Sequence, residues 1–165
     1  MLSERLRYHR VGPSDLHAFH RLVQDEHVRR YMMDGHVLPR AWSAQRIRDS
    51  RALFERRGVG IWLAYERITD DLVGFCGFQD PPDGSEPRLV YALLERFTGQ
   101  GLATEMARAA IEQARRWPGF AEIAADVDEI NVASVRVLEK LGFERVAVQP
   151  GAFGNLLALR FPAGR

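Results

Sequence analysis

The sequence predicts one domain of mixed α/β class, in which helices cover both faces of a single, strongly twisted, mixed β-sheet. First, apolar runs of strand length are interspersed with helical patterns along all 165 residues. Second, a strand, a glycine turn, a helix and another strand follow one another between residues 88 and 127. Such a crossover requires parallel flanking strands. Third, short connections elsewhere predict antiparallel hairpins, so the sheet is expected to be mixed.

The first part of the chain supplies helices and the first hairpin. Ser43 is expected to cap the longest helix of this part, and Gly58 and Gly60 to end it. The predicted elements are a strand over 6–11, helices over 16–25, 28–33 and 44–57, and strands over 61–67 and 72–78.

The second part begins with the crossover. Its helix has alanines and Met106 on one face and charged side chains on the other, and Pro118-Gly119 is expected to end it. The predicted elements are strands over 88–94 and 121–127, helices over 102–117 and 132–141, and strands over 143–148 and 155–161.

Composition excludes several functional classes. The formal net charge of +1 gives no strong field that would recruit nucleic acid or an anionic membrane. No stretch reaches the ~18 apolar residues of a membrane span, and the charged N-terminus lacks a signal peptide's apolar centre. We therefore expect a cytoplasmic protein, a monomer or homodimer spanning 1–165 as one domain. The single cysteine, Cys76, lies in an apolar run and is expected to be a core residue.

The turn from Arg96 to Glu105 is the most informative segment. Gly99 and Gly101 let the backbone approach a ligand closely, and the helix behind them offers unpaired N–H groups and a positive dipole end. A Walker loop would need Gly-Lys-Ser/Thr, and a dinucleotide fingerprint would need a glycine where Thr104 stands. The turn is therefore expected to hold an anion such as pyrophosphate in another way.

A second feature opens the helix over 132–141. Asn131 is suited to capping that helix, yet Asn131 and Ser134 share a face with the apolar Leu138 and Leu141. Two polar groups on an apolar stripe fit a ligand that lies along the helix. Gly142 is expected to end the helix as a left-handed cap.

The histidines form no persuasive metal site, since no carboxylate or cysteine at ligand spacing completes the pair His17 and His20. His36 is instead a candidate substrate contact. Tyr91, in the strand before the glycine turn, is interpreted first as a core residue.

Together these motifs resemble the Gcn5-related N-acetyltransferase (GNAT) superfamily over nearly the whole chain. The pattern is most similar to the branch that includes ribosomal-protein N-terminal acetyltransferases of the Rim type. An opening E-R-L pattern, a G-x-G-x-A-T-E turn and a closing N-x-x-S pattern are matched at Glu4, Arg5 and Leu6, at Gly99, Gly101, Ala103, Thr104 and Glu105, and at Asn131, Ser134, Val137, Glu139, Lys140, Gly142 and Phe143.

The resemblance implies a sheet of six to seven strands with a splayed V between the fourth and fifth strands, opened by a bulge at 91–94. Acetyl-CoA would be the co-substrate, with no metal. A backbone N–H near Leu93 would polarise the thioester carbonyl, and Ser134, with Tyr91 as second candidate, would protonate the leaving thiolate. The implied contacts of acetyl-CoA are Leu93, Leu94, Arg96, Phe97, Thr98, Gly99, Gln100, Gly101, Leu102, Ala103, Thr104, Asn131 and Ser134.

The acceptor is expected to be a primary amine, either a protein N-terminus or a small molecule. Relatives often carry a glutamate where this chain has Arg88-Leu89-Val90, so the general base is open and Glu86 is the nearest replacement. Neutralising an α-amine at pH 7 costs about 1.4 kcal/mol, against roughly 4.6 for a lysine, which favours amines of low pKa. The acceptor pocket is expected in the loops 31–38, 78–88 and 149–155, where Arg88 offers a contact for a succinyl group. The alternative is a non-catalytic acyl-CoA-binding module.

Overall fold

Seven strands form one sheet in the computed structural model, which describes residues 1–82, 84–117, 120 and 122–162. Their order is β1-β2-β3-β4-β5-β7-β6, and all neighbours are antiparallel except β4 and β5. The predicted mixed sheet is therefore confirmed. The strands are β1 (Leu6–Arg10), β2 (Ile61–Glu66), β3 (Leu72–Gln79), β4 (Arg88–Leu93), β5 (Ile123–Asp128), β6 (Glu144–Gly151) and β7 (Gly154–Phe161).

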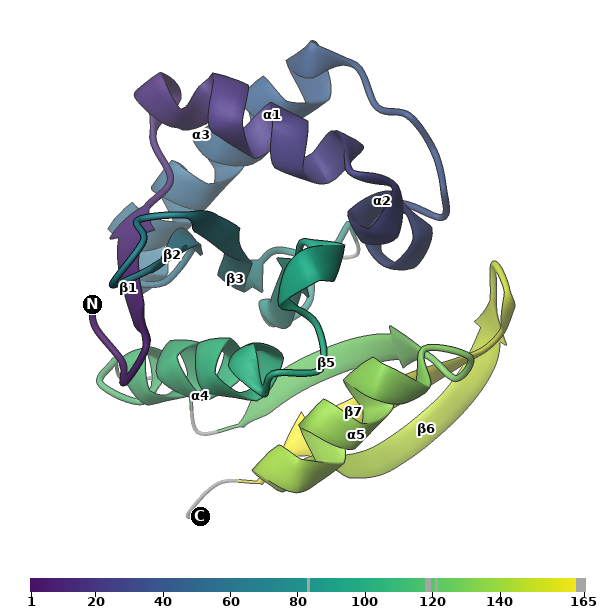
Figure 1. Ribbon diagram of the computed structural model, residues 1–165. Helices are drawn as coiled ribbons and strands as arrows, with labels where there is room; N and C mark the ends of the chain where they lie inside the picture. Colours follow the sequence, from purple (N-terminus) through teal and green to yellow (C-terminus); the bar gives the residue numbers. More distant parts are fainter. Residues whose placement is uncertain (83, 118–119, 121, 163–165) are drawn as a thin grey trace.

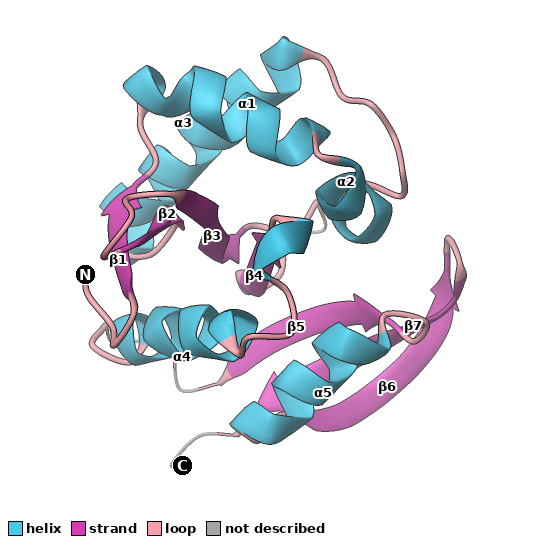
Figure 2. Cartoon of the chain, viewed as in Figure 1, coloured by secondary structure: helices cyan, strands magenta, loops and turns pink. Residues whose placement is uncertain are grey.

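Helices cover both faces of this sheet, as predicted (Figures 1 and 2). In the view of Figure 1, α1 and α3 lie above the β1–β3 part of the sheet, and α4 lies below it. No described helix combines the length and the apolar composition that crossing a lipid bilayer requires. The helices are α1 (Leu16–Gln24), α2 (Glu26–Met32), α3 (Arg40–Arg57), α4 (Leu102–Ala114) and α5 (Val132–Leu141), with the 3-10 turns η1 (Pro13–Asp15) and η2 (Glu95–Phe97).

Strand alternation divides the core between the two faces. Leu63 and Phe75 point to the α1 side and pack with Phe19, whereas Trp62 and Cys76 join the cluster that includes α4. Cys76 is fully buried, and burial raises the pKa of its thiol, so its prediction as a core residue is confirmed.

The fourth and fifth strands diverge as predicted. They pair at a single position, Arg88 with Ala124, and then separate along their length. The predicted bulge in β4 is wrong, because β3 and β4 pair without interruption from Gly74–Leu93 to Gln79–Arg88. Gly74 allows this regular pairing: a Cβ atom there would lie 2.1 Å from the carbonyl oxygen of Ala92. Register shifts occur instead in the β2–β3 pair, between Ala64 and Tyr65, and in the β6–β7 pair, between Arg145 and Ala147.

Among the element boundaries that differ from the prediction, two have a clear physical reason. Ser43 does not cap α3, which begins at Arg40; its buried hydroxyl lies 2.9 Å from Nδ1 of His20. Strand β6 runs through Pro150 to Gly151, which an edge strand tolerates because an edge residue needs no ladder donor. The predicted ends at Pro118-Gly119 and Ala121 lie outside the described residues, and the crossover helix α4 is described to Ala114.

Candidate functional site

A cavity of about 840 Å³ lies where β4 and β5 diverge, bounded by the first turns of α4 and α5. Most of the predicted site residues line it, although they come from three separate parts of the chain. They are Tyr91, Leu93, Phe97, Thr98, Gly99, Gly101, Leu102, Ala103, Thr104, Asn131 and Ser134.

The glycine turn forms the end of this cavity nearest α4. Gly99 and Gly101 have φ angles of 72° and 78°, in the left-handed region that other L-residues rarely adopt. Gly101 is the N-cap of α4, so the first N–H groups of the helix have no partner within it. Within the described part of the chain, no protein acceptor bonds the N–H groups from Gly99 to Thr104. This cluster of donors at a helix N-terminus suits a diphosphate.

Leu93 offers the main-chain groups that the sequence predicted in the V. Leu94 donates its N–H to the carbonyl of Val73, at 2.9 Å, and so faces β3. Because successive residues of an antiparallel ladder alternate in direction, the N–H and C=O of Leu93 face the gap toward β5. The carbonyl of Leu94 also accepts from Phe97, at 3.0 Å, so of these two residues Leu93 is the one whose main-chain groups face the gap.

Two hydroxyl groups meet across the cavity. The hydroxyl of Tyr91, on β4, lies 2.7 Å from Oγ of Ser134, on α5, and donates to the carbonyl of Ser134 at 3.2 Å. Burial raises the pKa of Tyr91 to about 12, although the hydrogen bond with Ser134 opposes this shift. Tyr91 therefore bridges the V and lines the cavity, in addition to packing against the core.

Asn131 caps α5 as predicted, and its Oδ1 accepts from the N–H of Ser134 at 3.2 Å. Because Oδ1 serves the cap, the amide NH₂ of Asn131 is the part of its side chain that remains to donate to a ligand. Gly142, with φ of 97°, ends the same helix in the predicted left-handed conformation.

Three of the predicted cofactor contacts, Leu94, Arg96 and Gln100, do not line the cavity. The guanidinium of Arg96 lies 4.8 Å from the ring centroid of Phe97. The carbonyl of Gln100 accepts a hydrogen bond from Arg5, at 2.8 Å, on the other side of the turn.

The cavity lining also includes carboxylates, which the sequence did not indicate. Asp34 and Asp128 both line the cavity, with His27 and Tyr31 of α2. Burial raises the pKa of Asp128, and the negative charge of Asp34 raises it further. The sequence separates these carboxylates by 94 positions, so only the fold brings them together.

Three loop residues named from the sequence lie elsewhere. His36 is exposed and does not line the cavity. Glu86 is paired with Arg57 at 2.9 Å, and Arg88 is paired with Asp126 at 3.0 Å. Glu86 and Arg88 thus each have an ion-pair partner, and neither lines the cavity.

Within residues 1–82, 84–117, 120 and 122–162, no three His, Cys, Asp or Glu side chains come together in a way that could hold a metal ion. The donors that line the cavity include backbone N–H groups, the hydroxyls of Tyr91 and Ser134 and the amide of Asn131, which suit phosphate and thioester oxygens.

Comparison with known families decides the assignment. Residues 5–144 match the model of the acetyltransferase (GNAT) domain. The chain belongs to the GNAT acetyltransferase family. This assignment confirms the superfamily inferred from the glycine turn and the Asn131 helix, and the splayed V is where the two motifs of this GNAT domain meet.

Solved structures share this GNAT fold along almost their whole length. A protein from Bordetella pertussis assigned to the GnaT acetyltransferase family is 19% identical, with a TM-score of 0.85 and 97% of each chain covered. RimL, a ribosomal-protein α-N-acetyltransferase solved with coenzyme A, is 18% identical, with a TM-score of 0.80 and coverage of 98% of this chain and 96% of its own. The aminoglycoside acetyltransferase AAC(6')-Ib, solved with ribostamycin and coenzyme A, is 16% identical, with a TM-score of 0.78 and coverage of 98% and 94%.

One curated relative is closer in sequence over a shorter region. The uncharacterized protein YkkB of Bacillus subtilis is 34% identical over 87 residues, which are 52% of this chain and 51% of that protein. The match thus spans about half the length of this relative.

Proposed function

We propose that this GNAT domain transfers the acetyl group of acetyl-CoA to a primary amine by direct attack in a ternary complex. The observation that carries the proposal is a single cavity that joins three features: unpaired amides at the glycine turn, outward-facing main-chain groups of Leu93, and the Tyr91–Ser134 hydroxyl pair. Diphosphate, thioester and leaving sulfur each have a matching group along this path.

Each group has a distinct part in the reaction. The amides from Gly99 to Thr104 would hold the diphosphate, and Asn131 would donate to the pantetheine arm. The N–H of Leu93 would bond the thioester oxygen as negative charge develops there. The amine nitrogen forms its bond to the acetyl carbon as the carbon–sulfur bond breaks.

Two proton transfers accompany the transfer of the acetyl group. The departing thiolate takes a proton from the Tyr91–Ser134 pair, and the acceptor amine loses one to solvent. Because burial places the pKa of Tyr91 at about 12, this hydroxyl is protonated at neutral pH and always able to donate.

The carboxylates in the cavity lining support an amine as the acceptor. Asp34 and Asp128 would attract an ammonium group and hold it near the V before it loses its proton. Solved structures with the same fold include one protein named for α-amine acetylation and one bound to an aminoglycoside. Among such acceptors, an α-amine near pKa 8 costs less to deprotonate than a lysine near 10.4.

The test has two stages. Calorimetry with CoA and acetyl-CoA checks the cofactor site, and a thiol reagent then follows CoA release from acetyl-CoA with peptides of free N-terminus, aminoglycosides and simple diamines. Thiol release that depends on one amine class supports the proposal. Binding of CoA without release for any amine would indicate a non-catalytic acyl-CoA-binding module, and no CoA binding would refute both.

A further inference from the structure

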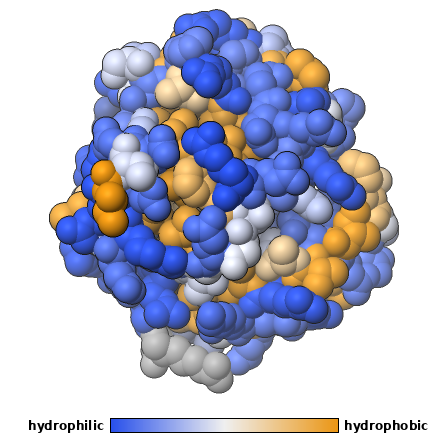
Figure 3. Space-filling view, in the orientation of Figure 1, coloured by the Kyte–Doolittle hydropathy of each residue, from blue (hydrophilic) through white to orange (hydrophobic). Residues whose placement is uncertain are grey.

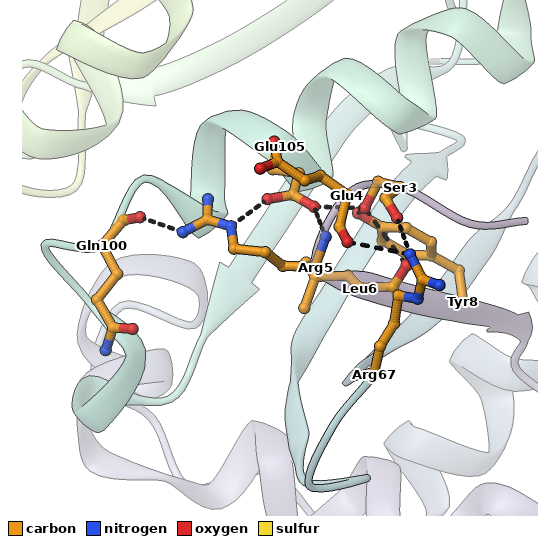
Figure 4. A network of polar contacts seen from close by, with 8 residues as sticks. All are labelled: Ser3, Glu4, Arg5, Leu6, Tyr8, Arg67, Gln100 and Glu105. Carbon is orange, nitrogen blue, oxygen red and sulfur yellow. Dashed lines mark hydrogen bonds and ion pairs between the residues drawn. The ribbon is translucent and has the colours of Figure 1, made fainter.

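The segment before β1 contacts the glycine turn through one arginine (Figure 4). Arg5 donates from Nη1 to the carbonyl of Gln100, at 2.8 Å, and from Nε to Glu105 on α4, also at 2.8 Å. The backbone N–H of Arg5 donates to the same carboxylate at 2.8 Å, and Ser3 donates to it at 2.6 Å. A single guanidinium thus joins the turn to the helix that follows it.

The carboxylate of Glu105 holds the guanidinium of Arg5 in place. Its side chain is only 13% exposed and accepts from three donors. Burial by itself would raise the pKa of Glu105, but the hydrogen bonds from Ser3 and Arg5 and the charge of Arg5 outweigh burial and lower it. Glu105 is therefore ionised at neutral pH and orients the guanidinium toward Gln100.

Arg5 acts from the side of the turn that faces away from the cavity. Arg5 and Glu105 line a separate hollow of about 520 Å³, whereas Gly101 borders both spaces. In a planar trans peptide, the carbonyl of Gln100 and the N–H of Gly101 point in opposite directions. A bond that holds the carbonyl toward Arg5 therefore holds the N–H of Gly101 away from Arg5.

We propose that Arg5 is a positioning residue for the diphosphate of the acyl donor: by fixing the Gln100–Gly101 peptide it orients the turn amides that bind phosphate. This inference rests on the proposed use of acetyl-CoA. Gly101, on one side of this peptide, has a φ of 78° and no Cβ atom, which leaves the peptide freer to rotate unless a side chain restrains it. Arg5 supplies the restraint before the donor binds, so less conformational freedom is lost on binding.

The experiment compares two acyl donors: acetyl-CoA, which carries the diphosphate, and acetyl-pantetheine, which lacks it. Arg5→Met keeps the length of the side chain and removes its donors. With acetyl-CoA, we expect the KM and the Kd of CoA to rise about tenfold while kcat changes less than about twofold. With acetyl-pantetheine, which has no diphosphate, the same variant should match the wild type. Circular dichroism verifies that each variant is folded.

Three further variants distinguish a positioning role of Arg5 from an effect of its charge and from general damage to the fold. Arg7, two residues along β1, is ion-paired with Asp70 away from the turn, so Arg7→Met should leave the Kd of CoA unchanged. The double variant Arg5→Met/Glu105→Gln removes both charges and should bind CoA as weakly as the single variant. Arg5→Lys keeps the charge but not the planar fork of donors, and should bind with intermediate affinity.

Three results would overturn the inference. These are wild-type affinity for CoA in Arg5→Met, an equal loss with both donors, or recovery of affinity in the double variant. If Arg5→Met does not fold, wild-type affinity in Arg5→Lys overturns it. A wild-type protein that binds no CoA at all would instead refute the proposed function, so the two failures are distinguishable.

Discussion

At the residue scale, the proposed proton transfer depends on the contact between Tyr91 and Ser134. The sequence indicated Ser134 through its place on an apolar helical stripe, and Tyr91 only through the resemblance to the family. Their contact joins β4 to α5, two elements whose paired residues are 43 positions apart. No periodicity in the sequence encodes such a contact, because it depends on how far β4 and β5 diverge.

Removing either hydroxyl should slow turnover without weakening the binding of CoA. Ser134→Ala and Tyr91→Phe each remove one member of the proton-donating pair, so we expect kcat to fall by about 100-fold for the member that contacts sulfur. Steady-state kinetics with calorimetry of CoA measures both quantities. Unchanged turnover in both variants would place the proton donor elsewhere.

The pH profile of the wild-type rate gives a related prediction. Because the pKa of Tyr91 is about 12, deprotonation of this hydroxyl should cause no fall in the rate up to about pH 10.

Two carboxylates of the cavity lining, Asp34 and Asp128, give a second prediction at this scale. The negative charge of Asp34 contributes to the raised pKa of Asp128, so Asp34→Asn should lower the pKa of Asp128. Carboxyl resonances followed by NMR during a pH titration would report the change. An unaltered Asp128 titration would show that burial alone raises its pKa.

At the scale of the element, the glycine turn was predictable because its chemistry is local. Glycine spacing, the following helical pattern and the missing Walker lysine are all adjacent in the chain, and the structure places Gly101 at the N-cap of α4 as expected. The start of α3 was missed because Ser43 has the chemistry of a cap but is buried against His20 inside the helix. The end of β6 was missed because Pro150 ends central strands but not edge strands.

The turn should tolerate no β-branched side chain. Gly101→Val places a residue at φ 78°, a strained region for it, and should reorient the amides enough to weaken CoA binding at least about tenfold. Gly84→Val is the matched control, since Gly84 has φ 69°, nothing within 4 Å of an added Cβ atom, and no place in the cavity lining. Both variants should lose some thermal stability, but only the first should lose affinity in calorimetry. Equal affinities would exclude the turn as the phosphate site.

On the scale of the whole molecule, the V separates two parts of the sheet that are linked by one parallel pair, by the Arg88–Asp126 ion pair and by the cluster around α4. The mixed class and the parallel crossover followed from the sequence because crossover topology is restrictive. The Arg5–Glu105 contact did not, because its partners lie 100 residues apart. Apolar side chains also gather on the surface over α5 and the β6–β7 hairpin in Figure 3. The exposed apolar residues in or beside these elements are Ile130, Val132, Val146, Val148 and Phe153.

The contact between the segment before β1 and Glu105 of α4 should make the free energy of unfolding depend on pH. The folded state lowers the pKa of Glu105 below its ordinary value near 4.5, so its carboxylate stabilises the fold above that pH. This contribution is lost as the pH falls through the lower, folded-state pKa. Urea unfolding between pH 6 and about pH 3 should therefore show a smaller loss of stability for Glu105→Gln than for the wild type. Parallel curves would mean that Glu105 titrates alike in both states.

The burial of Cys76 has a practical consequence for chemistry at the V. Its sulfur is fully enclosed between the sheet and the α4 cluster, and the sequence has no second cysteine. A colorimetric sulfhydryl probe added to native enzyme should therefore register almost no background from the polypeptide. The release of even one equivalent of coenzyme per polypeptide can then be quantified, so the first round of catalysis can be distinguished from those that follow.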